Sequence, residues 1–323
     1  MDIQTVLDLT RKLDDDDFVK EAYRMILLRE PDAEGFHANI KLLASGRTSE
    51  DAISDLLNSD EYHRRVIREL KPLQNLIELR PDKYSRIGDI LVFYADTSDD
   101  VDWLEICINN YDYYEVPGVW SLSMDDDKRL MAEILASLQP SKALELGCSC
   151  GAVMQCLSEM GIYCDGVEIS QLAIDHADNS IRHRIYKGDL LSLNITKSYD
   201  LIFGLDLFEH LNPRRIKNYL QTIYKLLIPE GICYANIPAF CDSYPRYLPN
   251  DRIHVDEKGY PLHGHLTWED ASWWDAQFAE AGFIRDQEAE RKIHAAYDER
   301  MAIMRRQIFI YRRQSSRKGS ISP

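Results

Sequence analysis

Two glycines and three small residues follow a short apolar run at residues 144–153, LELGCSCGAV. Gly147 and Gly151 would let the backbone of a strand-to-helix turn approach a ligand closely, and Ser149 between them is small. A helix beginning near Ala152 would add free backbone N–H groups. The turn therefore predicts a nucleotide-like binding site. An ordinary buried strand followed by a cysteine-rich loop is the alternative.

Two acidic residues follow the next two predicted strands, in the stretches CDGVEIS and YKGDLLSL. Glu168 stands about 20 residues beyond the glycine turn, where a carboxylate can accept both hydroxyls of a ribose. Asp189 is placed to accept a hydrogen bond from an adenine amino group. An exposed charge at a strand end is the alternative for Glu168. Together, the turn and the two acids predict a site for an adenosine-containing ligand.

Two further stretches continue the pattern: SYDLIFGLDLFEHL runs a long apolar strand into an acid and a histidine, and LLIPEGICYANIP supplies a Pro-Gly turn. In this order, the signals resemble the class I S-adenosylmethionine-dependent methyltransferases over about residues 125–312. The family's first motif, E-x-G-x-G-x-G, corresponds to residues 145–151, ELGCSCG, with serine in place of the middle glycine. Dehydrogenases typically show G-x-G-x-x-G, and this turn lacks the third glycine at that spacing.

The resemblance implies S-adenosylmethionine as the cofactor. Gly147 and Gly151 would contact its amino acid part, Glu168 its ribose and Asp189 its adenine, with residues 204–206 beneath the methyl group. The full set of cofactor-binding residues predicted in this way is Glu145, Gly147, Ser149, Gly151, Glu168, Ile169, Asp189, Leu190 and Asp206.

Methyl transfer from a sulfonium is an in-line displacement, and a hydroxyl acceptor must also lose a proton. The predicted catalytic residues are therefore His265, His210 and Glu209, of which the last two follow the fourth predicted strand. A structural role, with the ring hydrogen-bonded to backbone, is the alternative for His210.

A long insert at residues 238–267 and the residues just after it are rich in histidine and tryptophan. Such loops are often functional, and His263, Trp268 and Trp273 are predicted to bind the substrate, because aromatic rings with polar tips suit the face of a sugar. The stretch GYPLHGHLTW also resembles a subgroup of bacterial methyltransferases linked to surface glycans. Alternatively, Trp273 and Trp274 anchor the following helix in the core. His263 and His265 could ligate a metal, but no third ligand is evident, so no metal site is predicted.

Strands and helices alternate after Pro140, which predicts a parallel sheet with helices on both faces. The expected strands are residues 143–146, 164–168, 184–187, 199–205, 231–237 and the final QIFIYRR. The expected helices are residues 125–139, 152–160, 171–179, 213–227 and 268–281. The fold class is therefore α/β, with a doubly wound, mostly parallel, seven-stranded Rossmann-like sheet as the resemblance implies, in a domain at residues 125–313.

Short amphipathic helices precede this domain: Phe18, Ala22 and Ile26 share one helix face. Residues 1–70 are predicted to form a small helical domain, and their YRMILLREPDAEG core resembles a domain of unknown function that accompanies bacterial glycan-modifying enzymes. That resemblance implies an accessory module with a glycan-biosynthesis enzyme as a possible partner. Residues 71–124 are predicted to be a connector that packs on the catalytic domain, and one interpretation places it over the ligand. Residues 314–323 are predicted to be a disordered tail.

The composition limits the classes of partner that the protein is expected to bind. A net charge of −16, from 54 acidic and 38 basic residues, disfavours nucleic acid and anionic lipid. No apolar run reaches the length of a transmembrane helix, and the acidic N-terminus is no signal peptide. Seven cysteines without zinc-finger spacing are expected to be reduced thiols of a cytoplasmic protein.

The sequence thus predicts a methyltransferase that modifies an oxygen of a sugar or surface-glycan intermediate. Two alternatives stay open: an enzyme for a small non-sugar metabolite with the insert as a lid, and a cofactor-binding scaffold without turnover. A homo-oligomer is compatible with the sequence.

Overall fold

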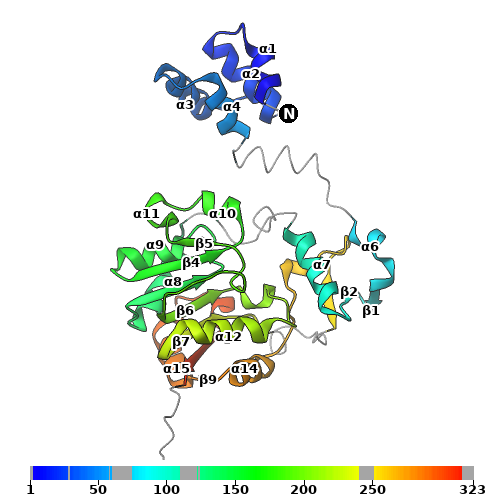
Figure 1. Ribbon diagram of the computed structural model, residues 1–323, viewed down its shortest axis with the longest axis vertical. Helices are drawn as coiled ribbons and strands as arrows, with labels where there is room; N and C mark the ends of the chain where they lie inside the picture. The colour runs from blue at the N-terminus through cyan, green and yellow to red at the C-terminus, as the bar shows by residue number, and fades with distance from the viewer. Residues whose placement is uncertain are drawn as a thin grey trace, which may run out of the picture. The chain divides into compact units, whose positions relative to one another are not determined.

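The computed structural model describes residues 3–27, 30–57, 59, 75–109, 122, 124–239 and 251–314. The chain divides into two compact units, residues 1–74 and 75–323 (Figure 1). Each unit has its own hydrophobic core. Among the described helices, none combines the length and the apolarity that crossing a membrane requires.

The first unit is helical, as predicted. Its described helices are α1 (Ile3–Thr10), α2 (Asp15–Leu27), α3 (Ala33–Ala44) and α4 (Ser49–Leu57). Phe18, Ala22 and Ile26 of α2 are buried in the shared core. Asp32 caps the N-terminus of α3 by accepting a hydrogen bond from the backbone N–H of Gly35. Residues 60–70 of the predicted helical domain lie outside the described residues.

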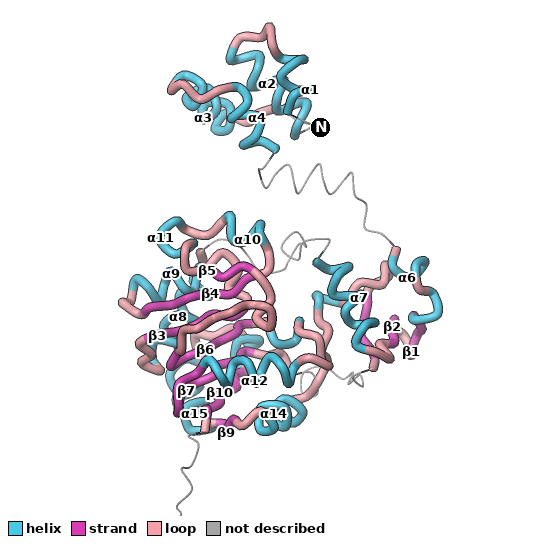
Figure 2. The backbone as a smooth tube through the Cα atoms, in the orientation of Figure 1, coloured by secondary structure: helices cyan, strands magenta, loops and turns pink. Residues whose placement is uncertain are grey.

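The second unit contains a seven-stranded sheet with the order β5-β4-β3-β6-β7-β10-β9 (Figure 2). Its strands are β3 (Lys142–Leu146), β4 (Tyr163–Glu168), β5 (Ile185–Lys187), β6 (Tyr199–Leu205), β7 (Leu227–Asn236), β9 (Phe283–Arg285) and β10 (Ile308–Arg313). The strands β5, β4, β3, β6 and β7 are parallel, and β10 is antiparallel to both neighbours. The predicted α/β class and the mostly parallel sheet are confirmed.

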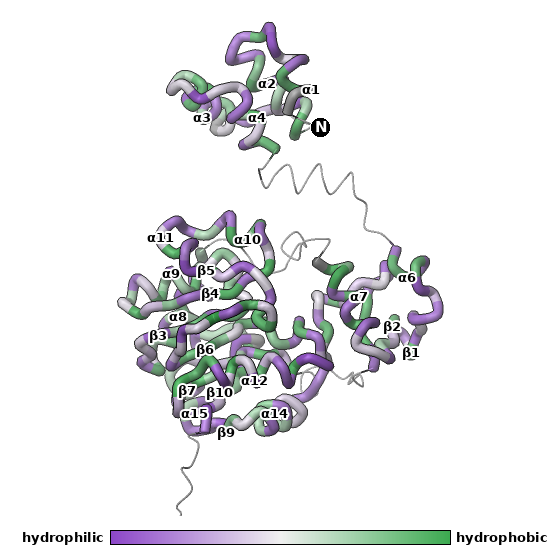
Figure 3. Tube along the Cα trace, viewed as in Figure 1, coloured by the Kyte–Doolittle hydropathy of each residue, from purple (hydrophilic) through white to green (hydrophobic). Residues whose placement is uncertain are grey.

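Helices cover both faces of this sheet, because its strands are apolar on both sides. The helices α8 (Asp126–Ser137), α9 (Ala152–Glu159) and α15 (Gln287–Tyr297) share one hydrophobic core with the sheet. The helices α12 (Ile216–Leu226) and α14 (Ala271–Glu280) share the other. Figure 3 shows the hydrophobic character of β6 and β7 between them. On β6, Phe203 faces the first core and Ile202 the second.

Some predicted boundaries were wrong for local reasons. The helix expected at residues 171–179 is two helices, α10 (Gln171–Asp175) and α11 (Asn179–Arg182), because Asp178 caps a new helix. The helix expected from Trp268 starts at Ala271, after the N-cap Asp270. The helix α15 and the edge strand β9 were not predicted.

A second, three-stranded antiparallel sheet is built from β1 (Tyr84–Ile87), β2 (Ile90–Tyr94) and β8 (Arg252–Val255). The first two strands come from the stretch predicted as a connector and the third from the insert, with Phe93 opposite Ile253. The helices α6 (Leu76–Leu79) and α7 (Ser98–Asn109) pack with this sheet around Phe93, Leu104 and Leu266. Where it is described, the connector therefore forms a small α/β layer together with the insert.

Candidate active site

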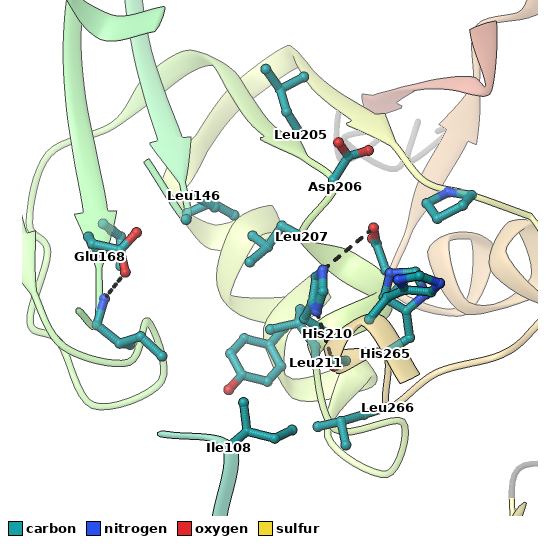
Figure 4. Close-up of a pocket in the computed structure, with 18 of the residues that line it drawn as sticks. Ile108, Leu146, Glu168, Leu205, Asp206, Leu207, His210, Leu211, His265 and Leu266 are labelled. Atoms are coloured by element: carbon teal, nitrogen blue, oxygen red, sulfur yellow. Dashed lines mark hydrogen bonds and ion pairs between the residues drawn. The ribbon is translucent and has the colours of Figure 1, made fainter. Parts of the chain in front are cut away.

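A cavity of about 1420 Å³ opens at the carboxyl ends of β3, β4 and β6. This is the switch point of the sheet, since β4 lies on one side of β3 and β6 lies on the other. Ligands of doubly wound sheets bind at such a point. The helix α7, the insert and the 3-10 helix η6 (Ile303–Arg306) complete the wall. Figure 4 shows the cavity from Glu168 at one end to His265 at the other.

The glycine turn after β3 has the left-handed backbone that its sequence suggests. Gly147, Ser149 and Gly151 have φ values of +63°, +53° and +73°. A Cβ on Gly147 would lie 2.8 Å from a methyl carbon of Leu207, and one on Gly151 only 2.5 Å from Ile181. These two positions therefore require glycine. Ser149 adopts a strained conformation in place of the family's middle glycine.

The predicted cofactor residues do not all reach the cavity. Gly147 lines it, whereas Ser149, Gly151 and Glu145 are not among its lining residues. Ser149 and Glu145 are both 3% exposed. Burial raises the pKa of Glu145 well above its usual range. These three residues shape the turn and the strand beneath it rather than the surface of the cavity.

Glu168 is the acceptor that fixes this turn. Its carboxylate accepts hydrogen bonds of 2.8 Å each from the backbone N–H groups of Ser149, Ile169 and Ser170. The residue is 3% exposed and lines the cavity together with Ile169. The alternative of an exposed strand-end charge is therefore wrong. The carboxylate is held in one orientation at the place predicted for a ribose.

Asp189 and Leu190 also line the cavity, after β5. One oxygen of Asp189 accepts from the backbone N–H of Leu191 at 2.9 Å, and the other from the hydroxyl of Tyr219 at 3.0 Å. Tyr219 comes from α12 and lines the cavity itself. It was not predicted, because nothing in the sequence links α12 to this strand end.

Asp206 follows β6 with a φ of +48° and is paired with Arg305. The Arg305 guanidinium also contacts Asp127 and the side-chain oxygen of Asn236, each at 3.0 Å. Arg305 lines the cavity although its side chain is only 7% exposed. This buried guanidinium was missed, because 99 residues separate it from Asp206.

The three residues predicted as catalytic come together. Glu209 and His210 form the 3-10 helix η4 (Phe208–His210), and His265 follows η5 (Leu262–Gly264) of the insert. The rings of His210 and His265 have centroids 4.8 Å apart, and Nε2 of His210 lies 3.8 Å from a carboxylate oxygen of Glu209. All three line the cavity (Figure 4).

Backbone contacts hold the insert against the end of β6. The carbonyl of Glu209 accepts from the N–H groups of Leu266 and Thr267 at 2.9 Å each. Nδ1 of His210 lies 3.1 Å from the carbonyl oxygen of Gly264, a contact in which the ring must donate. The ring of His210 is therefore hydrogen-bonded to backbone, as in its structural role, and its other nitrogen faces Glu209, as a catalytic role would require.

Burial dominates the electrostatics of this cluster. It lowers the pKa of His210 to about 4 and that of His265 well below its usual range, so both imidazoles are neutral at neutral pH. It raises the pKa of Glu209 well above its usual range, with the nearby Asp206 carboxylate adding to the effect. Glu209 is 1% exposed, and neither of its carboxylate oxygens accepts a hydrogen bond.

The residues predicted to bind substrate divide into two groups. His263 and Trp268 line the cavity, and the Trp268 indole N–H donates to the carbonyl of His265 at 2.8 Å. Trp273 was predicted to bind the substrate, but it does not line the cavity. Its ring packs edge-on against that of Trp274, with centroids 4.9 Å apart, against the core that α14 shares with the sheet. Trp274 is fully buried, as its alternative anchoring role requires.

Part of the cavity wall comes from the predicted connector. Asp102, Glu105 and Ile106 of α7 line it. Asp102 accepts from Asn212 at 2.7 Å and from Arg215 at 2.5 Å, and these contacts join α7 to the catalytic domain. Burial raises the pKa of Glu105. The spacing of these acids in the sequence gave no sign of their place in the site.

The fold is a doubly wound α/β domain with a cavity at its switch point, and family comparison identifies its class. Residues 143–231 match the family described as Methyltransferase domain. Residues 8–66 match the Domain of unknown function (DUF4214). The chain thus contains a class I S-adenosylmethionine-dependent methyltransferase domain: it is a methyltransferase, and S-adenosylmethionine is its cofactor. The comparison with curated proteins found no match.

Several solved structures are similar to part of this chain. CalS10, an amino pentose methyltransferase from Micromonospora echinaspora, is 16% identical with a TM-score of 0.42, and the match covers 59% of this chain and 92% of that chain. The CcbJ methyltransferase from Streptomyces caelestis is 19% identical with a TM-score of 0.43, covering 63% and 95%. Streptomyces venezuelae DesVI is 12% identical with a TM-score of 0.45, covering 60% and 94%. At these values the likeness carries no argument about the acceptor.

Proposed function

We propose that this enzyme methylates a hydroxyl oxygen of a sugar or glycan intermediate. The observation that carries the proposal is one continuous cavity with Glu168 and Asp189 at one end and Glu209, His210 and His265 at the other. Its volume of about 1420 Å³ exceeds the roughly 300–1,000 Å³ usual for a site that holds one small ligand. An acceptor can therefore lie beside the cofactor.

The cofactor end fits an adenosine-containing ligand. Gly147 leaves the backbone of the turn open to the cavity, and Glu168 keeps a fixed orientation through its three backbone donors. Asp189 and Tyr219 form a polar pair further along the wall. S-adenosylmethionine, when bound, supplies an electrophilic methyl group on sulfur. We propose that these residues hold its ribose and adenine, as the sequence resemblance implies.

The acceptor end suits a polyhydroxylated molecule. His263 and Trp268 line this end and offer ring surfaces that suit the face of a sugar. The GYPLHGHLTW stretch, which resembles glycan-linked methyltransferases, forms this part of the wall. These features favour a sugar over an apolar metabolite.

The hydroxyl proton must leave as the new oxygen–methyl bond forms. The neutral rings of His210 and His265 can accept it directly, as predicted from the sequence, and Glu209 is a third candidate. Alternatively, the same side chains can hold a cation that makes the hydroxyl more acidic. In either case these three residues assist the loss of the hydroxyl proton.

We also propose that the N-terminal helical unit is an accessory module that recruits or positions a glycan-biosynthesis enzyme. Its support is the sequence resemblance and the separate hydrophobic core of residues 1–74. Pull-down of candidate glycan enzymes by the full chain, and not by a chain with substitutions on the exposed helix faces, would test this role.

Calorimetry with S-adenosylhomocysteine, followed by turnover assays over sugar nucleotides and lipid-linked glycans, tests the main proposal. We expect binding with roughly one ligand per chain and methyl transfer to an acceptor of this class. Turnover restricted to non-sugar metabolites would contradict the sugar assignment. Binding without turnover on any acceptor would favour a scaffold.

A further inference from the structure

Glu209, His210 and His265 form a cluster with the composition of a metal site. One carboxylate oxygen and one nitrogen of each imidazole lie within 4.8 Å of one another. The cluster joins two segments that are 55 residues apart, at the wall of the cavity. Figure 4 shows His210 and His265 side by side, away from Glu168.

The carboxylate of Glu209 calls for a positive partner. It is 1% exposed and neither oxygen accepts a hydrogen bond, an arrangement that is unfavourable for a buried charge. The guanidinium of Arg305 is already engaged by Asp127 and Asp206. The contact of Glu209 with His210, at 3.8 Å, is longer than a hydrogen bond. A bound cation would compensate this carboxylate from inside the cavity.

The ring of His210 is oriented as a metal ligand is. Its Nδ1 donates to the carbonyl of Gly264, so the proton is on that nitrogen and the lone pair of Nε2 points toward Glu209. Metal-binding histidines in proteins are held by the same kind of contact through their second nitrogen. The backbone of His265 is held by the indole N–H of Trp268, which donates to its carbonyl, and the two rings pack with centroids 5.4 Å apart.

We propose that Glu209, His210 and His265 bind one divalent transition-metal ion at the acceptor end of the cavity. Two imidazoles and one carboxylate suit ions such as Zn²⁺ or Mn²⁺ and leave further coordination positions open. Ligand atoms around one such ion lie about 3–4 Å apart, so the observed spread requires only small side-chain adjustments.

The site deepens the proposed function, on which its catalytic role rests. The three side chains line the cavity, so hydroxyl oxygens of the acceptor could reach an ion that they hold. A coordinated hydroxyl ionises more readily and releases its proton to water, while its oxygen forms the bond to the methyl carbon as the sulfur–methyl bond breaks. The two histidines then act as ligands and not as proton acceptors.

Metal titration of the full chain tests the site directly. The protein is freed of metal with a chelator and titrated by calorimetry with Zn²⁺ or Mn²⁺. We expect one ion per chain for the wild type, and an affinity lower by at least about 10- to 100-fold in Glu209→Gln and His265→Gln, because even partners of metal ligands have effects of that size. His254→Gln is the matched control, since that ring also packs on Trp268 but does not line the cavity. Its affinity should stay within about twofold.

A second measurement covers variants that fold poorly. Zn²⁺ should raise the thermal midpoint of the wild type and of His254→Gln by a few degrees, and should leave that of His265→Gln unchanged. Equal ion affinity in the wild type and in both ligand variants, or no ion bound by the wild type, overturns the proposal.

Binding of S-adenosylhomocysteine is measured on the same samples to separate this proposal from the proposed function. If the cofactor product binds and the ion does not, the metal site fails and the proposed function stands. If the ion binds through these three residues and the cofactor product does not, the metal site is supported and the proposed function fails.

Discussion

The two ends of the cavity satisfy their buried acids in opposite ways. At the cofactor end, Glu168 takes three hydrogen bonds from the backbone of its own turn and its neighbours. At the acceptor end, Glu209 takes none, although it is buried to the same degree. A carboxylate whose partners come from the fold is ready to receive a ligand in a fixed position. One without them is a place where an incoming cation or proton has its largest effect.

The largest expected effect follows from removing the acid of the acceptor end. Glu209→Gln should lower kcat by about 100-fold or more, because it removes a group that deals with the acceptor proton or binds the ion that does. The affinity for S-adenosylhomocysteine should change less than about threefold. Steady-state kinetics and calorimetry measure the two quantities. Glu280→Gln is the control, because Glu280 is an exposed residue that pairs with Lys217. Equal losses in both quantities would mean that the two ends are not separate.

Removing the acid of the cofactor end should have the opposite profile. Glu168→Ala leaves three backbone N–H groups without their acceptor, so we expect the free energy of unfolding to fall by about 3 kcal/mol. Affinity for S-adenosylhomocysteine should fall by at least about tenfold. Urea denaturation and calorimetry provide the readouts. Unchanged stability would show that these hydrogen bonds are not what holds the glycine turn.

A smaller effect is expected from the polar pair beside the cofactor end. Tyr219→Phe removes the 3.0 Å hydrogen bond to Asp189 and should weaken cofactor-product binding by about threefold to tenfold. The acceptor KM should not move, because the Tyr219 hydroxyl contacts Asp189, which is assigned to the cofactor. Tyr224→Phe, on the same helix but outside the cavity, is the control. A change in acceptor KM alone would contradict the assignment of this wall to the cofactor.

The two tryptophans near the acceptor end should respond differently. Trp268→Phe removes an indole N–H that supports His265, and we expect a rise of a few-fold in the acceptor KM. Trp273→Phe should leave it within about twofold, because that ring packs against Trp274 and not on the cavity. Acceptor kinetics of the two variants provide the comparison. The opposite order would place the acceptor over α14.

The smallest effect concerns stability and pH. Burial raises the pKa of Glu269 to about 7, and its carboxylate has an oxygen with no hydrogen bond, as in Glu209. Because its pKa is higher in the folded than in the unfolded state, its contribution to stability is greatest below about pH 4 and is lost as pH rises toward 7. Glu269→Gln should flatten that part of the stability profile. Urea midpoints at pH 5 and pH 8 measure it, and an unchanged slope would contradict the assignment.

The cofactor end was predictable because its signals are local. The glycine turn, Glu168 and Asp189 each follow a recognisable apolar strand, and a parallel sheet brings such strand ends to one edge. Even there, Ser149 and Gly151, which were predicted to bind the cofactor, do not line the cavity. A sequence motif marks a structural requirement without saying which of its residues meets the ligand.

The acceptor end was only half predictable, because distant segments assemble it. His263 and His265 were considered as metal ligands and no metal site was predicted, because the sequence does not show that Glu209 and His210 lie within 4.8 Å of His265. Arg305 and the acids of α7 gave no signal at all, since their roles depend on pairing across the fold. The helix α15 was missed although Asp286 caps it, because its own sequence, QEAERKIHAAY, is mostly polar and buries only Glu290 and Ile293.

The pairing of β2 with β8 has a practical consequence for dissecting this chain. Because β8 belongs to the insert and its described sheet partner precedes residue 125, a fragment starting at the methyltransferase domain boundary would leave the insert strand without a hydrogen-bonding neighbour. The Phe93 and Leu104 side chains that cover Leu266 would be lost with it. A truncated enzyme should therefore begin before Leu76, and one that begins later is expected to aggregate through the uncovered edge.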